Sequence, residues 1–253
     1  MLADVFLVLQ VPAFRYLKLQ KADRKAMIQQ SIELPLAPDS CASRRVTTYS
    51  QKKVAEDNDF FIYCCDGQST PFFAESLFHQ PGFEQVWLIG VHNFPSQRNA
   101  EYVHSLGSPS FVQHETFFTG TVRSWAESIT GIKHRPERTS VFGYSCGGAF
   151  AFSMGVRHPQ LLRTTFAFSI AAWPLENPHP KPDAEMQSSV FYLRTGSREP
   201  GGMRATMKRL QKWLKPASPK INATSAPGGH DAVFWSRQFN QCVEETLTRL
   251  NAR

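Results

Sequence analysis

Residues 138–150 read Arg-Thr-Ser-Val-Phe-Gly-Tyr-Ser-Cys-Gly-Gly-Ala-Phe and place one serine, Ser145, between two glycines. A serine on a sharp turn from a strand into a helix must adopt a strained backbone conformation. Any side chain two residues before or after that serine would collide with the neighbouring strand or helix. Gly143 and Gly147 remove those collisions, so the stretch has the layout of a nucleophile elbow.

The residues on both sides of this turn supply the context that the motif requires. The run Ser140–Phe142 predicts a buried strand, and Gly148–His158 predicts a helix that must end before Pro159. A serine flanked by glycines at this spacing also occurs by chance in structural turns. The assignment therefore depends on partner residues elsewhere in the chain.

Two candidate partners follow later in the sequence, each just past the end of a predicted strand. The apolar run Val190–Leu193 leads into a loop that carries Glu199, and the run Ile221–Ala226 leads into a loop that carries His230. Serine, then acid, then histidine is the chain order of the α/β-hydrolase fold. Because ligands bind at the carboxyl ends of strands in open α/β sheets, we expect the three loops to converge on one crevice.

At this point the chain resembles a known family of esterases with the α/β-hydrolase fold. That family includes enterochelin-type siderophore esterases, esterase D (S-formylglutathione hydrolase), feruloyl and acetyl-xylan esterases and the mycobacterial mycolyltransferases. Five segments look like its successive signature blocks, in the right order. They are Ile62-Tyr63-Cys64-Cys65-Asp66-Gly67-Gln68, Gln97-Arg98-Asn99-Ala100-Glu101-Tyr102, Gly143-Tyr144-Ser145-Cys146-Gly147-Gly148, Arg194-Thr195-Gly196-Ser197-Arg198-Glu199 and Gly228-Gly229-His230-Asp231-Ala232-Val233-Phe234-Trp235.

The resemblance runs from roughly Ile32 to the C-terminus and implies a serine esterase that works through an acyl-enzyme. It favours the enterochelin-esterase-like branch over esterase D, whose elbow usually carries methionine where this chain has Cys146. An extra N-terminal domain such as the larger siderophore esterases carry is not expected, which argues against a direct equivalence with them. A general carboxylesterase for short acyl or aryl esters is the first alternative. A non-catalytic binding protein on the same fold is the alternative from another class.

Acyl transfer assigns a role to each residue of the predicted site. Serine is a poor nucleophile at its free pKa, so a neutral imidazole, His230, is expected to take the proton of Ser145. Backbone amides then stabilise the oxyanion. We expect one amide from Cys146, which follows the nucleophile, and the other from Gln68 or Gly67 in the loop after the third strand.

The acid is the member of this triad with the most competing interpretations. Glu199 lies beside Arg198 and would also suit a surface ion pair, while Asp183 and Glu185 precede the relevant strand. An acid that bonds the far ring nitrogen of the histidine fixes its tautomer, and either Asp or Glu can serve. Its position favours Glu199. Some enterochelin-type members are described as serine–histidine dyads, which leaves open how much the acid contributes.

Two further residues are predicted to touch the substrate. Arg98 belongs to the block after the fourth strand, where it could face a substrate oxygen or form a buried pair with Glu101 that braces the loop. Trp173 follows the sixth strand and could form a wall of the substrate pocket or pack in the core. The histidines at positions 92, 104, 114 and 158 are expected outside the catalytic set, although His92 follows a strand and could line the crevice.

The rest of the chain alternates strands with helices, which predicts an α/β domain with a mainly parallel central sheet and helices on both faces. Two helices have clear apolar faces: 117–130, through Phe118, Val122, Trp125 and Ile129, and 234–250 at the C-terminus. The expected strands span 32–36, 45–49, 60–65, 86–92, 139–142, 164–169, 189–193 and 221–226.

The chain of 253 residues suits a single domain, which we assign to residues 31–253, after an N-terminal extension of unclear role at 1–30. Within the extension, Val5–Val11 is too short to span a membrane and lacks the flanks of a secretory signal, so it is expected to form a strand. Residues 18–30 are expected to form a polar helix or an extension. No membrane partner is predicted, and the sequence leaves the oligomeric state open.

Composition narrows the set of partners. The formal charge of +7 would suit an anionic partner, but the basic residues are scattered and no nucleic-acid motif accompanies them, so a small-molecule ester is expected and nucleic acid is not. The five cysteines form no disulfide framework, and reduced thiols favour a cytoplasmic location. Neither the cysteines nor the eight dispersed histidines have metal-ligand spacing, so no metal or cofactor is predicted.

Overall fold

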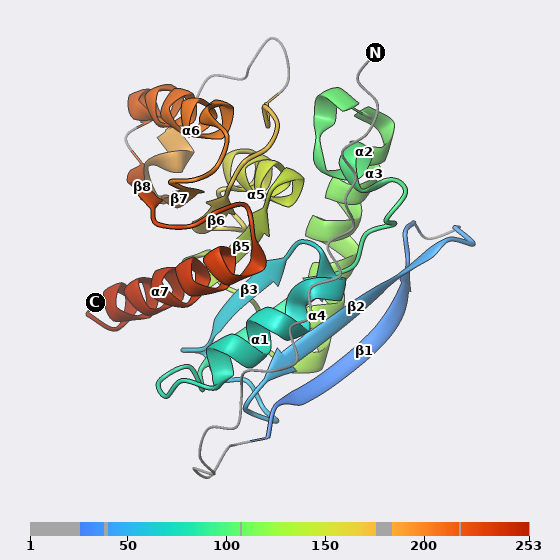
Figure 1. Ribbon diagram of the computed structural model, residues 1–253. Coiled ribbons are helices and arrows are strands. Elements are labelled where there is room, and N and C mark those ends of the chain that lie inside the picture. The colour runs from blue at the N-terminus through green and yellow to red at the C-terminus, as the bar shows by residue number, and fades with distance from the viewer. Residues whose placement is uncertain (1–25, 38–39, 107, 176–183, 218, 253) are drawn as a thin grey trace.

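The computed structural model describes residues 26–37, 40–106, 108–175, 184–217 and 219–252. One eight-stranded sheet runs through the molecule in the order β1-β2-β4-β3-β5-β6-β7-β8 (Figure 1). The pairs β1/β2 and β2/β4 are antiparallel, and every other neighbouring pair is parallel. The strands are β1 (Ile28–Pro35), β2 (Ser43–Ser50), β3 (Phe60–Cys64), β4 (Val86–Val91), β5 (Thr139–Tyr144), β6 (Thr164–Phe168), β7 (Val190–Gly196) and β8 (Lys220–Ala226).

Helices cover both faces of the sheet, as predicted. On one side α1 and α7 lie across the strands, and the other helices lie on the opposite side (Figure 1). The helices are α1 (Thr70–Phe78), α2 (Arg98–Tyr102), α3 (Ser108–Thr116), α4 (Arg123–Thr130), α5 (Cys146–Arg157), α6 (Gly201–Leu214) and α7 (Ala232–Asn251). Short 3₁₀ turns lie at Gly67–Ser69 (η1), His104–Leu106 (η2), Pro136–Arg138 (η4), Ala184–Ser188 (η5) and Lys215–Ala217 (η6), and the π-helical turn η3 is at Phe117–Val122.

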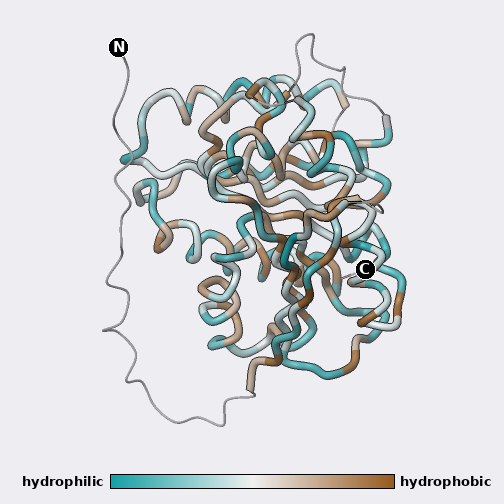
Figure 2. Tube along the Cα trace, turned by 90° about the vertical axis from the view of Figure 1, so that its right-hand side faces the viewer, coloured by the Kyte–Doolittle hydropathy of each residue, from teal (hydrophilic) through white to brown (hydrophobic). Residues whose placement is uncertain are grey.

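The strands divide the core into two apolar layers because successive side chains point to opposite faces of a sheet. In β3, Phe60 and Ile62 pack with α1 and α7, whereas Phe61 and Tyr63 pack with α4 and α5 on the other face. All five residues of β3 are buried, as expected for a central strand covered on both faces. Figure 2 shows hydrophobic segments through the middle of the molecule and hydrophilic ones mainly at its periphery.

The predicted elements agree with the structure except at two places. β1 begins at Ile28 and pairs with β2 along its whole length, so residues 28–30 belong to a strand of the sheet and not to a polar helix or an N-terminal extension. The predicted strand at Val5–Val11 lies outside the described residues. The predicted helix 117–130 begins with the wider π turn η3, after which the buried positions are Ala126 and Thr130, not Trp125 and Ile129.

Among the described residues, no helix is both long and apolar enough to cross a membrane.

Candidate active site

Ser145 occupies the sharp turn between β5 and α5, and its backbone has φ 57° and ψ −125°. The turn is fixed by backbone hydrogen bonds, because the Ser145 amide donates to the Phe168 carbonyl at 3.0 Å and its carbonyl accepts from Ala149 at 3.2 Å. A Cβ on Gly143 would lie 2.0 Å from the Gly147 carbonyl oxygen, so this position requires glycine. The elbow predicted from the sequence is therefore present.

The two glycines after the serine differ in how tightly they are enclosed. A Cβ on Gly147 would lie 3.0 Å from Oδ2 of Asp66, a side chain that could give way. A Cβ on Gly148 would lie 2.5 Å from the Phe168 carbonyl oxygen, which belongs to the backbone of the adjacent strand. A side chain at Gly148 is thus tolerated less well than one at Gly147. The role of Gly148 was missed from the sequence because the elbow motif specifies glycine only at Gly143 and Gly147.

The structure brings Ser145, His230 and Glu199 into one hydrogen-bonded chain. Nε2 of His230 lies 3.1 Å from Oγ of Ser145, and Nδ1 lies 3.0 Å from Oε1 of Glu199. The Glu199 side chain is fully buried, whereas that of His230 is 32% exposed. Oε2 of Glu199 accepts a further hydrogen bond from the Gly196 amide at 3.0 Å. The three loops meet at the carboxyl ends of their strands, as the order of the residues along the chain predicted.

The neighbours of Glu199 settle which acid lies at the site. Glu199 bonds His230, while Arg198 uses its amide to bond the Gly228 carbonyl at 2.9 Å. Asp231 caps α7 by accepting from the Phe234 amide at 2.8 Å. Asp183 lies outside the described residues.

An aromatic side chain supports His230 from the side. The Trp235 ring lies 4.9 Å from the imidazole at an interplanar angle of 87°, and it stacks on Tyr144 at 4.1 Å. The indole Nε1–H donates to Oγ of Ser169 at 2.8 Å, and Ser169 itself has φ 49°. The sequence included Trp235 in a signature block but gave it no role, because no pattern links it to Ser169 or Tyr144.

Two backbone segments carry the amides that were predicted to bind the oxyanion. Within the described structure, Ser145 forms no side-chain hydrogen bond to the first turn of α5, which begins at Cys146. The first amides of a helix lack partners inside the helix and favour an anion. On the other side, Asp66 has φ 53° and ψ 54° and leads into η1, with Gly67 buried and Gln68 exposed. Burial raises the pKa of the Cys146 thiol, which disfavours a thiolate nucleophile here.

The predicted pairing of Arg98 with Glu101 is wrong. Arg98 forms a bidentate ion pair with Asp66, with Nε–Oδ1 at 2.6 Å and Nη2–Oδ2 at 2.7 Å. Glu101 pairs with the buried Arg44, whose Nη2 lies 2.7 Å from Oε1. The two residues lie one turn apart on α2, but Arg98 points to the loop after β3 and Glu101 into the core beneath it.

The other residues singled out in the sequence form no hydrogen bond with Ser145 or His230 among the contacts of the described structure. Trp173 is half-buried against the core, and the Arg209 guanidinium lies 4.2 Å from its ring centroid. His92 is half-buried directly after β4, and burial together with Arg45 lowers its pKa. His114 bonds Arg44, and His158 bonds Glu115, so these two take part in buried ionic networks.

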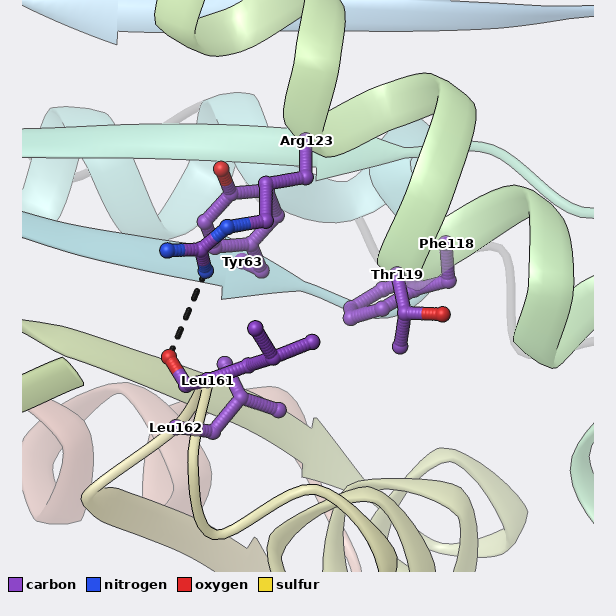
Figure 3. Close-up of a pocket in the computed structure, with 6 residues that line it drawn as sticks. All are labelled: Tyr63, Phe118, Thr119, Arg123, Leu161 and Leu162. Carbon is purple, nitrogen blue, oxygen red and sulfur yellow. Dashed lines mark hydrogen bonds between the residues drawn. The ribbon is translucent and has the colours of Figure 1, made fainter. Parts of the chain in front are cut away.

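A small cavity elsewhere in the fold does not belong to this site. It is lined by Tyr63, Phe118, Thr119, Arg123, Leu161 and Leu162, and Arg123 donates to the Leu161 carbonyl at 3.3 Å (Figure 3). Its volume of about 10 Å³ is room for about one water molecule. No nucleophile or acid–base pair lines it, so it is a packing void. Among the described residues, no group of three or more His, Cys, Asp and Glu side chains could hold a metal ion.

Comparison with known proteins places this geometry in context. No protein-family model and no curated protein sequence matches the chain. Solved structures do match: the BES protein from Bacillus cereus has a TM-score of 0.67 at 16% identity, covering 93% of this chain and 98% of that one. The enterobactin esterase FES from Shigella flexneri in the presence of enterobactin has a TM-score of 0.67 at 21% identity. That match covers 88% of this chain and 60% of FES.

A third solved structure, the enterobactin and salmochelin hydrolase IroE, has a TM-score of 0.60 at 15% identity and covers 89% of this chain and 96% of its own. The three similarities cover between 88% and 93% of this chain. The protein therefore has the α/β-hydrolase fold.

Proposed function

We propose that this protein is a serine hydrolase that cleaves carboxylic esters through an acyl-enzyme. The observation that carries the proposal is the hydrogen-bonded chain from Ser145 through His230 to Glu199, built on a serine with positive φ. A serine in that backbone conformation is strained, and such strain persists where the surrounding structure enforces it. Its neighbours here are a base and an acid at hydrogen-bond distance, which is the arrangement that activates a hydroxyl.

The hydrogen bonds of Glu199 define the tautomer of His230. An ionised carboxylate only accepts hydrogen bonds, so Nδ1 of His230 carries the ring proton and donates a hydrogen bond to Oε1 of Glu199. Nε2 is then unprotonated and accepts the hydroxyl proton of Ser145 as the oxygen attacks the ester carbonyl. The imidazolium next protonates the leaving alcohol. A water molecule then attacks the acyl group, with His230 as its base, and Ser145 is regenerated.

The negative charge on the carbonyl oxygen requires fixed donors. The Cys146 amide, at the uncapped start of α5, is the first donor in this proposal, and the amide of Gln68 or Gly67 is the second. Each such donor contributes roughly 3 kcal/mol of transition-state stabilisation in well-studied hydrolases. Both segments lie at the carboxyl ends of neighbouring strands, β5 and β3.

The proposed substrate class is supported by the names of the structural relatives. Those relatives are named as an enterobactin esterase, an enterobactin and salmochelin hydrolase and a ferulic acid esterase, which supports an ester of an aromatic acid or a catecholate siderophore. A short-chain or aryl carboxylesterase is the alternative. All five cysteines are free thiols, which supports the cytoplasmic location expected from the sequence.

An ester panel tests this function. It contains p-nitrophenyl esters of increasing acyl length, a feruloyl ester, S-formylglutathione and a catecholate trilactone, each assayed with the wild type and with Ser145→Ala. We expect turnover of at least one ester and its loss in the variant by several orders of magnitude. Equal rates in the two proteins would refute the proposal. Binding of a panel member without turnover by the wild type would point to the non-catalytic alternative.

A further inference from the structure

We propose that Arg98 contributes to ester hydrolysis through Asp66 and not through the substrate: it neutralises and holds the carboxylate behind the loop that supplies the second oxyanion amide. The inference rests on the proposed function and adds a positioning pair to it. Arg98 and Asp66 lie 32 residues apart in the sequence, and their ion pair joins α2 to the end of β3.

Asp66 holds its loop in an unusual backbone conformation. It is a non-glycine residue at φ 53° and ψ 54°, directly before Gly67 and Gln68. Its amide donates to Oη of Tyr102 at 2.7 Å, and its carboxylate receives Nδ2 of Asn93 at 2.6 Å. A left-handed conformation at such a residue persists only where its surroundings enforce it, and here these bonds do so.

The carboxylate uses both of its oxygens on the guanidinium of Arg98. Nε donates to Oδ1 at 2.6 Å and Nη2 donates to Oδ2 at 2.7 Å, which is the planar bidentate geometry of the strongest ion pairs. The Asp66 side chain is 3% exposed and that of Arg98 is 24% exposed. The ring of Tyr102 lies 5.3 Å from the guanidinium carbon, so the cation also faces an aromatic ring.

The same carboxylate lies against the start of α5. A Cβ on Gly147 would be only 3.0 Å from Oδ2 of Asp66, so the carboxylate borders the turn that begins with Cys146. Charge on that carboxylate would repel the oxyanion that forms beside the Cys146 amide, and repulsion is strong where water is excluded. Arg98 cancels this charge. Asn93 extends the network to the second donor loop, because its Oδ1 accepts from Nε2 of Gln68 at 3.2 Å.

A direct role for Arg98 in substrate binding fits these contacts less well. The flat edge of the guanidinium formed by Nε and Nη2 is occupied by Asp66, and that is the edge suited to bidentate capture of a carboxylate or phosphate. The positive charge is also compensated by its partner. Removing Asp66 together with Arg98 therefore distinguishes the two roles.

The test compares Arg98→Gln, Asp66→Asn and the double variant with the wild type in steady-state ester hydrolysis. We expect Arg98→Gln to lower kcat about a hundredfold or more, the loss typical of a damaged oxyanion site, with KM changed less than about threefold. The double variant, in which no uncompensated carboxylate remains, should recover at least about tenfold of that loss. Arg98→Lys, which keeps the positive charge but not the bidentate geometry of the guanidinium, should retain more activity than Arg98→Gln.

Arg157→Gln is the matched control, because Arg157 forms a similar ion pair, Nε to Oε1 of Glu115 at 2.6 Å, with exposures of 33% and 8%. It should lower the melting temperature and leave kcat unchanged. If Arg98→Gln is too unstable to assay, the Arg98→Lys and Asp66→Asn arms decide. Three results would overturn the inference. The first is an effect of Arg98→Gln on KM without an effect on kcat, and the second is a double variant no more active than Arg98→Gln. The third is a loss of kcat in Arg157→Gln equal to that in Arg98→Gln. If the wild type turns over no ester, the proposed function fails as well. Failure of the inference alone leaves a wild type that is active, so the two failures are distinguishable.

Discussion

Replacing Glu199 with glutamine changes one atom type at the least exposed member of the triad. Oε2 of Glu199 accepts the Gly196 amide at 3.0 Å, so glutamine must place its carbonyl oxygen there to keep that bond. Its NH₂ group then faces Nδ1 of His230, where the carboxylate oxygen stood at 3.0 Å. Two donors cannot share this contact, so the imidazole takes the other tautomer, with its proton on Nε2 and directed at Ser145.

The expected loss follows from this reversed tautomer. A histidine protonated on Nε2 cannot accept the hydroxyl proton of Ser145, and neutralising a buried triad acid costs about ten-thousand-fold in kcat where it has been measured. That factor corresponds to about 5.5 kcal/mol of transition-state stabilisation. Stability should change little, since the amide retains the volume and the bond to Gly196.

The assay is kcat and KM on an activated ester, with the melting temperature as a measure of folding. The matched control is Asp231→Asn, because Asp231 neighbours His230 but caps α7, a role that asparagine also fills. Turnover by Glu199→Gln within tenfold of the wild type would refute the tautomer argument. If Ser145 and His230 variants were inactive at the same time, the site would operate as a dyad.

Three further predictions concern the elbow, the aromatic support and the buried histidines. Gly143→Ala places a Cβ 2.0 Å from the Gly147 carbonyl oxygen and should lower the free energy of unfolding, measured in urea, by about 3 kcal/mol. Gly120→Ala, whose Cβ would have no atom within 4 Å, should be near neutral. Equal stabilities of the two variants would contradict this prediction. Trp235→Leu should lower kcat about tenfold to about a hundredfold at constant KM, because the ring supports His230. Phe239→Leu, on the same helix but buried in the core, should leave kcat unchanged. Equal kcat values of the two variants would contradict this prediction. Burial lowers the pKa of His114 and of His134 to about 3, so both stay neutral in the folded chain and take up protons only on unfolding below about pH 6.5. Stability should therefore fall by about 2 kcal/mol per histidine between pH 6.5 and pH 4.5. His134→Gln should flatten that dependence in urea unfolding, and an unchanged slope would contradict the assignment.

The sheet and the catalytic loops were predictable because their signals are local. Strands buried on both faces appear as short apolar runs, and glycine or proline marks their ends, which is why β3 to β8 lie where the sequence placed them. Ser145, Glu199 and His230 each follow such a run, so the topology alone brings them to one edge. The elbow was also predictable, because Gly143 stands where any side chain would collide with the Gly147 carbonyl oxygen.

What the sequence could not show depends on contacts between distant segments. Glu101 was one of two expected partners of Arg98, beside a substrate oxygen, but the actual partner, Asp66, lies at the end of another strand. The π turn at Phe117–Val122 shifts the buried face of α4, and an apolar pattern with helical spacing does not reveal such a turn. Ser169 has positive φ without being glycine, so no residue type marked its conformation.

Covalent labelling of the intact protein with a fluorophosphonate tests the central claim most directly, because the reagent requires an activated serine and no knowledge of the substrate. The wild type should gain the mass of one label, and peptide mapping should place it on Ser145. Ser145→Ala and His230→Ala should remain unlabelled under the same conditions. A wild-type protein that stays unlabelled while a control hydrolase reacts, or a label that persists in Ser145→Ala, would contradict the assignment of Ser145 as the nucleophile.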